Sequence, residues 1–355
     1  MRLEARAEVS RALQLAAPLA AIAVTLVVCS LLVAWSGVPV ASAYRLLLEG
    51  AAGSGFAVSE TLTRATPLII TGLAVSVAFR AKLYNIGAEG QLYAGALAAV
   101  AVANAGLALP PAIVFPLVLA AAMAAGALLL IGPALLKTRF HVDEVVTTLL
   151  VNFIALLFVS MILDGPMKDP TAMGWPQSVA IPEEFELEKL AERSRVHSGL
   201  LLAFALAVAV WMVDRFTVFG FEMRAVGANA RAAAFAGMPV HAVVLKTALL
   251  SGALAGLAGG IEVMGRAGYV TLDMSPGYGY SGIVIAMLAQ LNPLGVVAAA
   301  IFVAGILVGA DSMSRALTVP TYIADVIVSV SLLSMLVATL SAQYRVVRAR
   351  SAHAR

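Results

Sequence analysis

The sequence predicts an all-α polytopic membrane protein with about ten transmembrane helices. Of its 355 residues, 61% are hydrophobic and 12% are charged, and the mean hydropathy is +0.96. A soluble domain carries about 25% charged residues, so the deficit indicates a chain that lies mostly in lipid. The basic residues between the apolar runs also fall mainly on one side when each run is counted as a crossing.

Ten apolar runs are candidates for crossings. One of them, 280–291, has only 12 residues. As a helix it is about 18 Å long, shorter than a hydrocarbon core of about 30 Å. It can span only if its flanks also enter the membrane or if protein occupies the bilayer around it. The other runs are 12–36, 65–79, 91–109, 112–136, 144–163, 199–213, 242–264, 295–312 and 321–340.

The first run follows Arg2, Arg6 and Arg11 and has 25 residues. The apolar core of a signal peptide has about 7–15 residues. We therefore expect a retained first helix, although Ala41-Ser42-Ala43 resembles a cleavage site.

The Lys and Arg residues predict the orientation. With the N-terminus inside and ten crossings, 14 of them face the inner side and 7 the outer side, and four of those 7 lie in the long loop 164–197. Long loops obey the charge rule least. Without a crossing at 280–291, the basic tail 343–355 would lie outside. We therefore predict one transmembrane domain, 1–355, with both termini and the loop 216–241 cytoplasmic and the loop 164–197 extracytoplasmic.

An internal echo relates the second and seventh segments. Each is followed by a polar or aromatic loop that contains glycine, and then by a segment rich in small residues. The two segments cross in opposite directions, which is typical of an inverted repeat whose broken helices meet near the midplane. Glycines between 252 and 260 are expected to let helices pack closely.

Residue patterns for catalysis, metals and cofactors are missing from the sequence. It has no HExxH or GxSxG motif, and no Gly-Lys pair for a phosphate-binding loop. Its one cysteine, Cys29, and its four scattered histidines have no ligand spacing. We expect no catalytic residue, metal site or cofactor in this chain, and no nucleic-acid partner. The histidines are His141, His197, His241 and His353.

Ionisable residues inside a membrane mark ion or proton coupling. The candidates all fall near predicted helix ends, where long side chains can reach the interface, and no segment is expected to hold a deep acidic residue paired with a base. Coupling to protons therefore lacks support. These candidates are Lys246, Glu262, Asp311 and Asp325.

A short helix is predicted in the loop 216–241. Asn229 is a good N-cap for a helix over 230–236, and Gly237 is a good stop before Pro239. The helix is rich in alanine and poor in charge, which suits insertion into a groove on another protein. The alternative is a simple surface helix, although such helices are usually richer in Lys and Glu.

Four segments follow one another along the chain in a family order: YNIGAEGQLYAGA (84–96), MRAVGANARAAAFAGM (223–238), LSGALAGLAGGIEVMG (250–265) and YSGIVIAMLAQLNPLGVVAAA (280–300). They resemble ABC-transporter permeases of the branched-chain amino acid, simple-sugar and nucleoside group. FHVDEVVTTLLVNFIALL (140–157) and DGPMKDP (164–170) look like the longer, nucleoside-type subunit. The resemblance covers most of residues 60–340. One departure is AMLAQLNP, where an arginine is common just before the asparagine, so a role of that base does not carry over to Gln290.

The resemblance implies an importer subunit of type II, vitamin B12-importer-like architecture in the bacterial cytoplasmic membrane. ATP and Mg would bind a separate cytoplasmic ATPase subunit. A second, non-identical permease and an extracytoplasmic substrate-binding lipoprotein would complete the assembly. The residues expected to contact the ATPase subunit are Glu222, Arg224, Gly227, Asn229, Ala232, Ala233, Ala234 and Gly237.

Seven polar or aromatic residues are candidates for the substrate pathway. Glu89 could instead support a helix start, Asn152 could join helices, and Tyr278 and Tyr280 could belong to an interfacial aromatic belt. Gly87 and Gly90 are expected to allow a tight turn and a close helix approach. The candidates are Asn85, Glu89, Gln91, Asn152, Tyr278, Tyr280 and Ser281.

These observations lead to the prediction of an importer permease for nucleosides or related small polar solutes. Permeases for simple sugars or other solutes of the same group are the nearest alternative. A stand-alone secondary transporter, a channel and a membrane scaffold remain alternatives from other classes.

Overall fold

The computed structural model describes most of the chain, namely residues 39–192 and 194–317, with 2–5, 344–347 and scattered positions in 23–37 and 326–341. Parts of three predicted features lie outside the described residues: the beginning of the run 12–36, most of the run 321–340, and the tail 343–355 apart from 344–347. The chain forms two compact units. Unit 1 comprises Met1–Ala57 with Gly305–Arg355, and unit 2 comprises Val58–Ala304.

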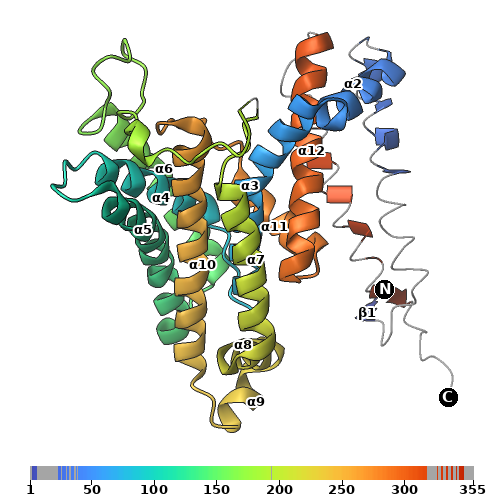
Figure 1. Cartoon of the computed structure of the whole chain (residues 1–355). Helices are drawn as coiled ribbons and strands as arrows, with labels where there is room; N and C mark the ends of the chain where they lie inside the picture. Colours follow the sequence, from blue (N-terminus) through green and yellow to red (C-terminus); the bar gives the residue numbers. More distant parts are fainter. Residues whose placement is uncertain are drawn as a thin grey trace. The chain divides into compact units, whose positions relative to one another are not determined.

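The described chain is mostly helical (Figure 1). Two short strands, β1 (Arg2–Ala5) and β2 (Tyr344–Val347), pair in antiparallel fashion within unit 1. The α-helices are α2 (Val40–Ala52), α3 (Gly55–Arg80), α4 (Ala88–Ala103), α5 (Pro111–Phe140), α6 (Glu144–Asp164), α7 (Gly199–Phe216), α8 (Val218–Ala228), α9 (Ala230–Phe235), α10 (Val240–Glu262), α11 (Tyr278–Leu288) and α12 (Pro293–Leu317). A 3-10 turn, η1 (Glu183–Phe185), and a π-helical turn, η2 (Val263–Ala267), complete the elements.

Among the described residues, six helices are long and apolar enough to cross a membrane, and a seventh span exists if the bent pair Leu26–Trp35 and Val40–Ala52 counts as one. The six are α3, α5, α6, α7, α10 with η2, and α12. The apolar helices α4 and α11 are shorter. The chain is therefore a multi-pass membrane protein, and its described residues contain fewer full-length spans than the ten crossings predicted for the whole sequence.

Helix α3 begins at Gly55 rather than at residue 65, where the apolar run starts. The Ser54 Oγ accepts a hydrogen bond from the Ala57 amide at 3.0 Å, which caps the first turn. Glu60 and Arg64 follow on one face, since they are four residues apart. Hydrophobicity alone placed these two charged residues outside the helix.

Helix α10 forms the core of unit 2 and packs against α4 and α5. A β-carbon at Gly95 would overlap the Gly256 carbonyl, and one at Gly126 would overlap the Gly252 carbonyl. Only glycine permits these backbones to approach so closely, which confirms the close packing expected of the glycines in 252–260.

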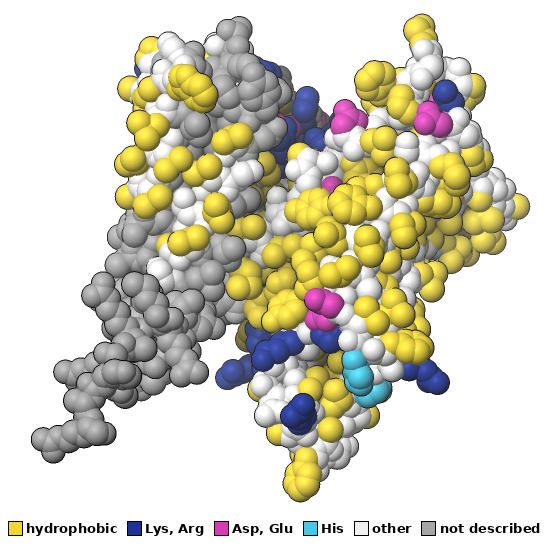
Figure 2. All heavy atoms as spheres, turned by 180° about the vertical axis from the view of Figure 1, so that it is seen from behind, with side chains coloured by type: hydrophobic (Ala, Val, Ile, Leu, Met, Phe, Trp, Pro, Cys, Tyr) yellow, Lys and Arg dark blue, Asp and Glu magenta, His cyan; other side chains and the backbone are white. Residues whose placement is uncertain are grey.

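The two ends of unit 2 carry different features. In Figure 1, α8 and α9 project at the lower end, and the loop 164–197 lies at the upper end. On the face shown in Figure 2, hydrophobic side chains cover the middle, and Lys and Arg side chains gather below them. Exposed Leu150, Phe153 and Leu157 of α6 contribute apolar surface of the kind that faces lipid.

Candidate transport pathway and coupling surface

The polar stretch between α3 and α4 begins with a sharp turn at Lys82. The Lys82 amide donates to the Phe79 carbonyl and the Leu83 amide to the Ala78 carbonyl, both at 3.0 Å. Lys82 itself has φ +51°. This is the Schellman end of a helix, with lysine in the left-handed position that glycine usually takes. Gly87, which we expected to make the turn, has φ −85°.

The glycines of this stretch serve close approach instead. A β-carbon at Gly87 would lie 2.8 Å from the Thr148 carbonyl oxygen, and one at Gly90 would lie 2.9 Å from the Asn152 Oδ1. These distances are shorter than van der Waals contact. Gly87 and Gly90 therefore let the start of α4 lie directly against α6, as the sequence predicted for the helix approach.

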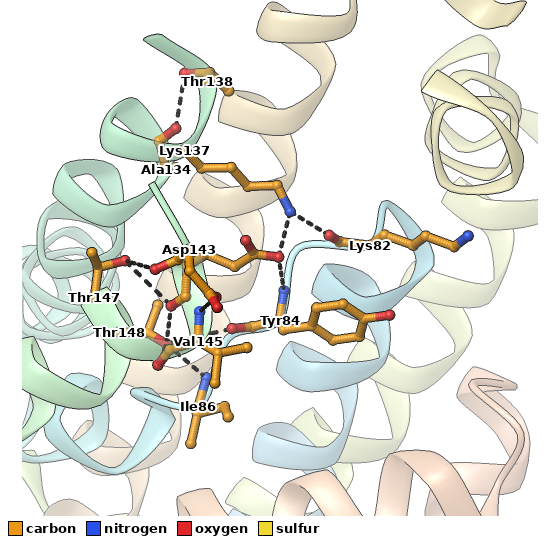
Figure 3. A network of polar contacts seen from close by, with 11 residues as sticks. Lys82, Tyr84, Ile86, Ala134, Lys137, Thr138, Asp143, Val145, Thr147 and Thr148 are labelled. Carbon is orange, nitrogen blue, oxygen red and sulfur yellow. Dashed lines mark hydrogen bonds and ion pairs between the residues drawn. The ribbon is translucent and has the colours of Figure 1, made fainter. Parts of the chain in front are cut away.

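The corner between α5 and α6 holds the turn from the other side (Figure 3). Lys137 donates to the Lys82 carbonyl at 2.5 Å and pairs with Glu144. Thr148 accepts from the Ile86 amide at 3.2 Å. The turn is thus fixed through its backbone by side chains of two other helices.

Asn85 and Gln91 form a reciprocal pair of side-chain amides. Each donates to the other at 2.9 Å. The Asn85 Oδ1 also accepts from the Gly87 amide at 3.1 Å, and its Nδ2 lies 3.2 Å from the Ser251 Oγ of α10. Both side chains are at most 2% exposed. Their polar atoms therefore bond within the protein and hold the turn against α10.

Helices α4, α6 and α11 meet through the remaining candidates. The Glu89 Oε2 accepts from the Gly279 amide at 2.5 Å. The Asn152 Oδ1 accepts from the Gly90 amide at 2.5 Å, and its Nδ2 donates to the Tyr280 hydroxyl at 2.6 Å. Tyr278 is fully buried, whereas Tyr280 is 37% exposed. The structure thus brings most pathway candidates to the junction where α4 and α11 begin.

Ser281, the seventh candidate, lies in the same first turn of α11 and is half-buried. Its backbone amide donates to the Gly277 carbonyl at 2.9 Å. The alternative roles given above for Asn152 and Glu89 agree with these contacts. Asn152 joins helices, and Glu89 links the starts of two helices.

The predicted short helix in the loop 216–241 is confirmed as α9. The Asn229 Oδ1 accepts from the Arg231 and Ala232 amides at 3.0 and 3.1 Å, which is N-cap geometry. Gly237 has φ +83° and ends the helix. The helix lies at the projecting end of unit 2 (Figure 1).

The eight residues expected at the ATPase contact fall into exposed and inward-facing groups. Asn229, Ala232, Ala234 and Gly237 are exposed, and Glu222 and Arg224 are half-buried. Ala233 is only 4% exposed, and Gly227 is buried with no room for a β-carbon beside the Arg80 carbonyl. Phe235, which sequence reasoning missed, is 97% exposed. An exposed phenylalanine beside alanines makes an apolar tip.

A pocket of about 410 Å³ opens beside this tip. Asn229 and Ala230 at the start of α9 line it, together with basic residues of three other segments. These basic residues are Lys82, Lys137, His141 and His241.

An ion network connects α8 to α3 and α7. Asp214 of α7 lies 3.4 Å from an Arg80 nitrogen and 3.2 Å from an Arg224 nitrogen. Arg80 also donates to the Leu291 carbonyl at 2.6 Å, as does Ser76 at 2.7 Å. Leu291 lies in the turn between α11 and α12, beside Gln290. The ends of several helices are therefore joined through Arg80.

A buried group of charged residues at the other end corrects one expectation. Glu262 does not reach an interface: it is fully buried and its Oε1 lies 2.5 Å from the Arg266 Nε. Glu60 and Arg64 of α3 pair four residues apart in the same way, at 3.6 Å. The spacing E-x-x-x-R, in ETLTR and EVMGR, was visible in the sequence. Hydrophobicity places both pairs at helix ends, so it does not predict that they are buried.

The loop 164–197 covers this end of α10 through backbone bonds. The Leu187 amide donates to the Met264 carbonyl at 2.9 Å, and the Ile181 amide to the Gly268 carbonyl at 2.8 Å. Arg195 approaches Glu60 at 3.2 Å. The His197 ring packs on Gly265, and burial and the charge of Arg266 lower the pKa of His197 to about 4. These contacts attach the loop to the end of α10 and to α3.

Comparison with known proteins places the chain in a transporter family. Residues 57–338 match the model of the branched-chain amino acid transport system / permease component family, and the chain belongs to this family. It is 38% identical to the guanosine ABC transporter permease protein NupP of Bacillus subtilis, over 92% of this chain and 94% of that protein.

Other relatives carry different descriptions. The glucose ABC transporter permease protein TsgB13 of Haloferax volcanii is 38% identical over 86% of this chain and 82% of its own length. The guanosine ABC transporter permease protein NupQ of Bacillus subtilis is 30% identical over 69% of this chain and 78% of its own. No solved structure matches the chain.

Proposed function

We propose that this chain is the membrane-spanning permease subunit of an ATP-driven importer for nucleosides, in the bacterial cytoplasmic membrane. The observation that carries the proposal is the 38% identity to a guanosine permease protein along nearly the full length of both chains. The proposal includes ten crossings, cytoplasmic termini and a type II permease architecture built as an inverted repeat. The short helices α4 and α11, each following a long helix, support that repeat.

The exposed face of α9 is the proposed docking site for a cytoplasmic ATPase subunit that binds ATP and Mg. The exposed surface of α9 is apolar and consists of Ala232, Ala234 and Phe235. Because two of these side chains are small, the helix could fit into a groove on a partner. Closure of the ATPase pair would move α9 and α8 together. Arg224, Asp214 and Arg80 would then carry the movement to α3 and to the turn at Leu291.

Two further partners belong to the proposal. A substrate-binding lipoprotein would deliver the solute to the face that carries the loop 164–197. A second, non-identical permease would form the other wall of the pathway. The two different guanosine permease proteins of Bacillus subtilis, NupP and NupQ, support a pair of unlike permeases.

The junction of α4, α6 and α11 is the proposed pathway wall. Glu89, Asn152 and Tyr280 join those helices there. Their hydrogen bonds hold the junction closed in this conformation, and the solute would pass when the helices separate. We therefore assign these residues to the moving wall, together with the remaining pathway candidates.

A permease for a simple sugar is the second candidate function. It is favoured by the equal identity of 38% to a glucose permease protein, although that match covers less of both chains. Nucleosides and sugars are both small polyhydroxylated solutes, so the same helix junction could serve either.

Uptake into proteoliposomes tests both candidates. The complete assembly, with its ATPase subunit, second permease and binding protein, is expected to accumulate labelled guanosine only with internal ATP and Mg. Excess unlabelled glucose should not compete. Competition by glucose with no guanosine uptake would establish the sugar permease instead. Accumulation without ATP or without the ATPase subunit would contradict the proposal and favour a secondary transporter.

A further inference from the structure

The buried group of charged residues beneath the loop 164–197 includes polar atoms that have no hydrogen-bond partner among the described residues. This polar cluster consists of Glu60 and Arg64 of α3, Glu262 of α10, Arg266 of η2 and Tyr278 of α11. The Glu262 and Tyr278 side chains are both fully buried. Arg266 connects Glu262 to the segment that precedes Tyr278: its Nε lies 2.5 Å from the Glu262 Oε1, and its Nη2 donates to the Met274 carbonyl at 3.4 Å.

The cluster is expensive to keep in a membrane protein. Removing a charged pair from water carries a desolvation penalty for each ion, and ionisable residues within a membrane are rare and usually functional. The ion pairs offset only part of this desolvation penalty. Arg266 contacts one oxygen of Glu262, and Arg64 lies beside Glu60. A purely structural role could be served as well by apolar residues.

The Glu262 Oε2 and the Tyr278 hydroxyl oxygen have no hydrogen-bond partner among the described residues. A buried tyrosine hydroxyl nearly always has a partner. By contrast, the Tyr93 hydroxyl in the same unit donates to the Leu272 carbonyl at 2.6 Å and accepts from the Ser275 amide at 3.2 Å. The two unpartnered atoms together offer a carboxylate acceptor and a hydroxyl that can donate or accept.

The backbone around both atoms is interrupted. Glu262 ends α10, and the π-helical turn η2 begins at the next residue and is capped by Gly268, which has φ +75°. Tyr278 is the first residue of α11 and follows Gly277, which has φ +83°. Turns of π-helix occur often at functional sites, and the ends of broken helices bind solutes in transporters.

We infer that Glu262 and Tyr278 form a recognition subsite for adjacent hydroxyl groups of the transported solute. The inference rests on the proposed function and adds the residues and the chemical group. A carboxylate binds vicinal hydroxyls of a sugar ring by accepting their hydrogens, as acidic residues do for ribose. Arg266 compensates the carboxylate charge and fixes its orientation through Oε1.

The shared chemistry fits both kinds of relative. The ribose of a nucleoside and the ring of a free sugar each carry adjacent hydroxyls, and a guanosine and a glucose permease protein are equally similar to this chain. The subsite is closed to solvent in this conformation, since both side chains are fully buried. A solute would reach it when α11 and the loop 164–197 move apart.

The test measures the maximal uptake rate of the complete assembly at a saturating concentration of solute-loaded binding protein. Under this condition the affinity of the binding protein no longer affects the rate, so differences between solutes report on the permease. The wild-type ratio of maximal uptake of guanosine to 2′,3′-dideoxyguanosine is expected to be about tenfold or more, as the loss of a hydrogen bond to a charged group gives. Glu262→Gln and Tyr278→Phe should bring this ratio close to one. The same assay with glucose shows whether a nucleoside or a free sugar supplies the hydroxyls.

Thermal stability separates recognition from a structural role. Tyr278→Phe is expected to keep the wild-type melting temperature or raise it, because it removes a buried hydroxyl without a partner. The matched control Tyr93→Phe breaks two bonds, so it should lower the melting temperature and leave the uptake ratio unchanged.

An unchanged uptake ratio in Tyr278→Phe and in folded Glu262→Gln, with normal wild-type transport, would overturn the subsite alone. Failure of the wild-type assembly to transport either solute would overturn the proposed function, and the subsite with it.

Discussion

Some of the pathway candidates have all their side-chain polar atoms hydrogen-bonded within the protein, and Asn85 is the clearest case. Asn85 uses both ends of its amide, toward Gln91, the Gly87 amide and Ser251. The sequence indicated that such residues would face the helix bundle. It could not indicate which of them would be fully paired, because that depends on helices more than 150 positions away along the chain.

His197 gives the clearest residue-scale prediction. Its ring is buried without a hydrogen-bond partner among the described residues and lies near Arg266, so its pKa falls to about 4. In the unfolded chain the pKa is about 6.5. The unfolded state therefore binds more protons between these values, and stability falls as the pH drops through this window. Between pH 7 and pH 5 the free energy of unfolding is expected to fall by on the order of 2 kcal/mol.

Melting temperatures of the detergent-solubilised protein at pH 7 and pH 5 measure this effect. His197→Leu places a non-titrating apolar side chain of similar size against Gly265 and should shrink the difference between the two pH values. An equal difference in the wild type and in the variant would show that other groups cause it.

At the scale of elements, α9 shows what local rules can and cannot predict. Its start at Asn229 and its end at Gly237 follow from capping chemistry that operates within a few residues. The exposure of Phe235 and the burial of Ala233 follow from how α9 lies on α8 and α10, which no local rule gives. Ala233 is thus part of the support beneath the proposed docking face.

This distinction determines which substitutions test ATPase docking. A charged residue at Ala233 or at Gly237, with its φ of +83°, would disturb α9 itself. Ala232→Glu with Phe235→Asp changes only exposed positions, for which stability effects are usually within about 0.5 kcal/mol. We expect the melting temperature to stay the same and the ATPase subunit to be lost on co-purification. Met173→Glu, at a fully exposed site in the loop 164–197, is the control.

Wild-type recovery of the ATPase subunit by the double variant would rule out α9 as the main contact. Loss of the subunit in Met173→Glu as well would show that the assay reports damage rather than docking.

At the scale of the whole chain, composition and charge sufficed to predict a multi-pass helical protein. The described residues include six full-length spans and two shorter apolar helices, α4 and α11. Hydropathy counts apolar length and cannot register that α4 starts at a polar turn or that α3 begins with a charged pair. Burial among other helices, rather than lipid contact, makes those polar residues tolerable.

The ion network at Asp214 predicts how distant parts act together. Asp214→Asn keeps the side-chain shape but removes the charge that Arg80 and Arg224 share. We expect the complete assembly to form and to hydrolyse ATP, with several-fold less guanosine transported for each ATP. Paired measurements of uptake and phosphate release give this ratio. Arg215→Gln, a neighbouring exposed position, should leave the ratio unchanged, and a normal ratio in Asp214→Asn would exclude the network as the link.

The bonds that fasten the loop 164–197 have a consequence for how the protein can evolve. Several of them join backbone to backbone, as from Ile181 to Gly268 and from Ser178 to Val270. Hydrogen bonds between backbone groups depend little on the identity of the side chains around them. Mutations can therefore accumulate across the loop and change the surface that the proposed binding protein would meet, while these backbone hydrogen bonds over α10 persist.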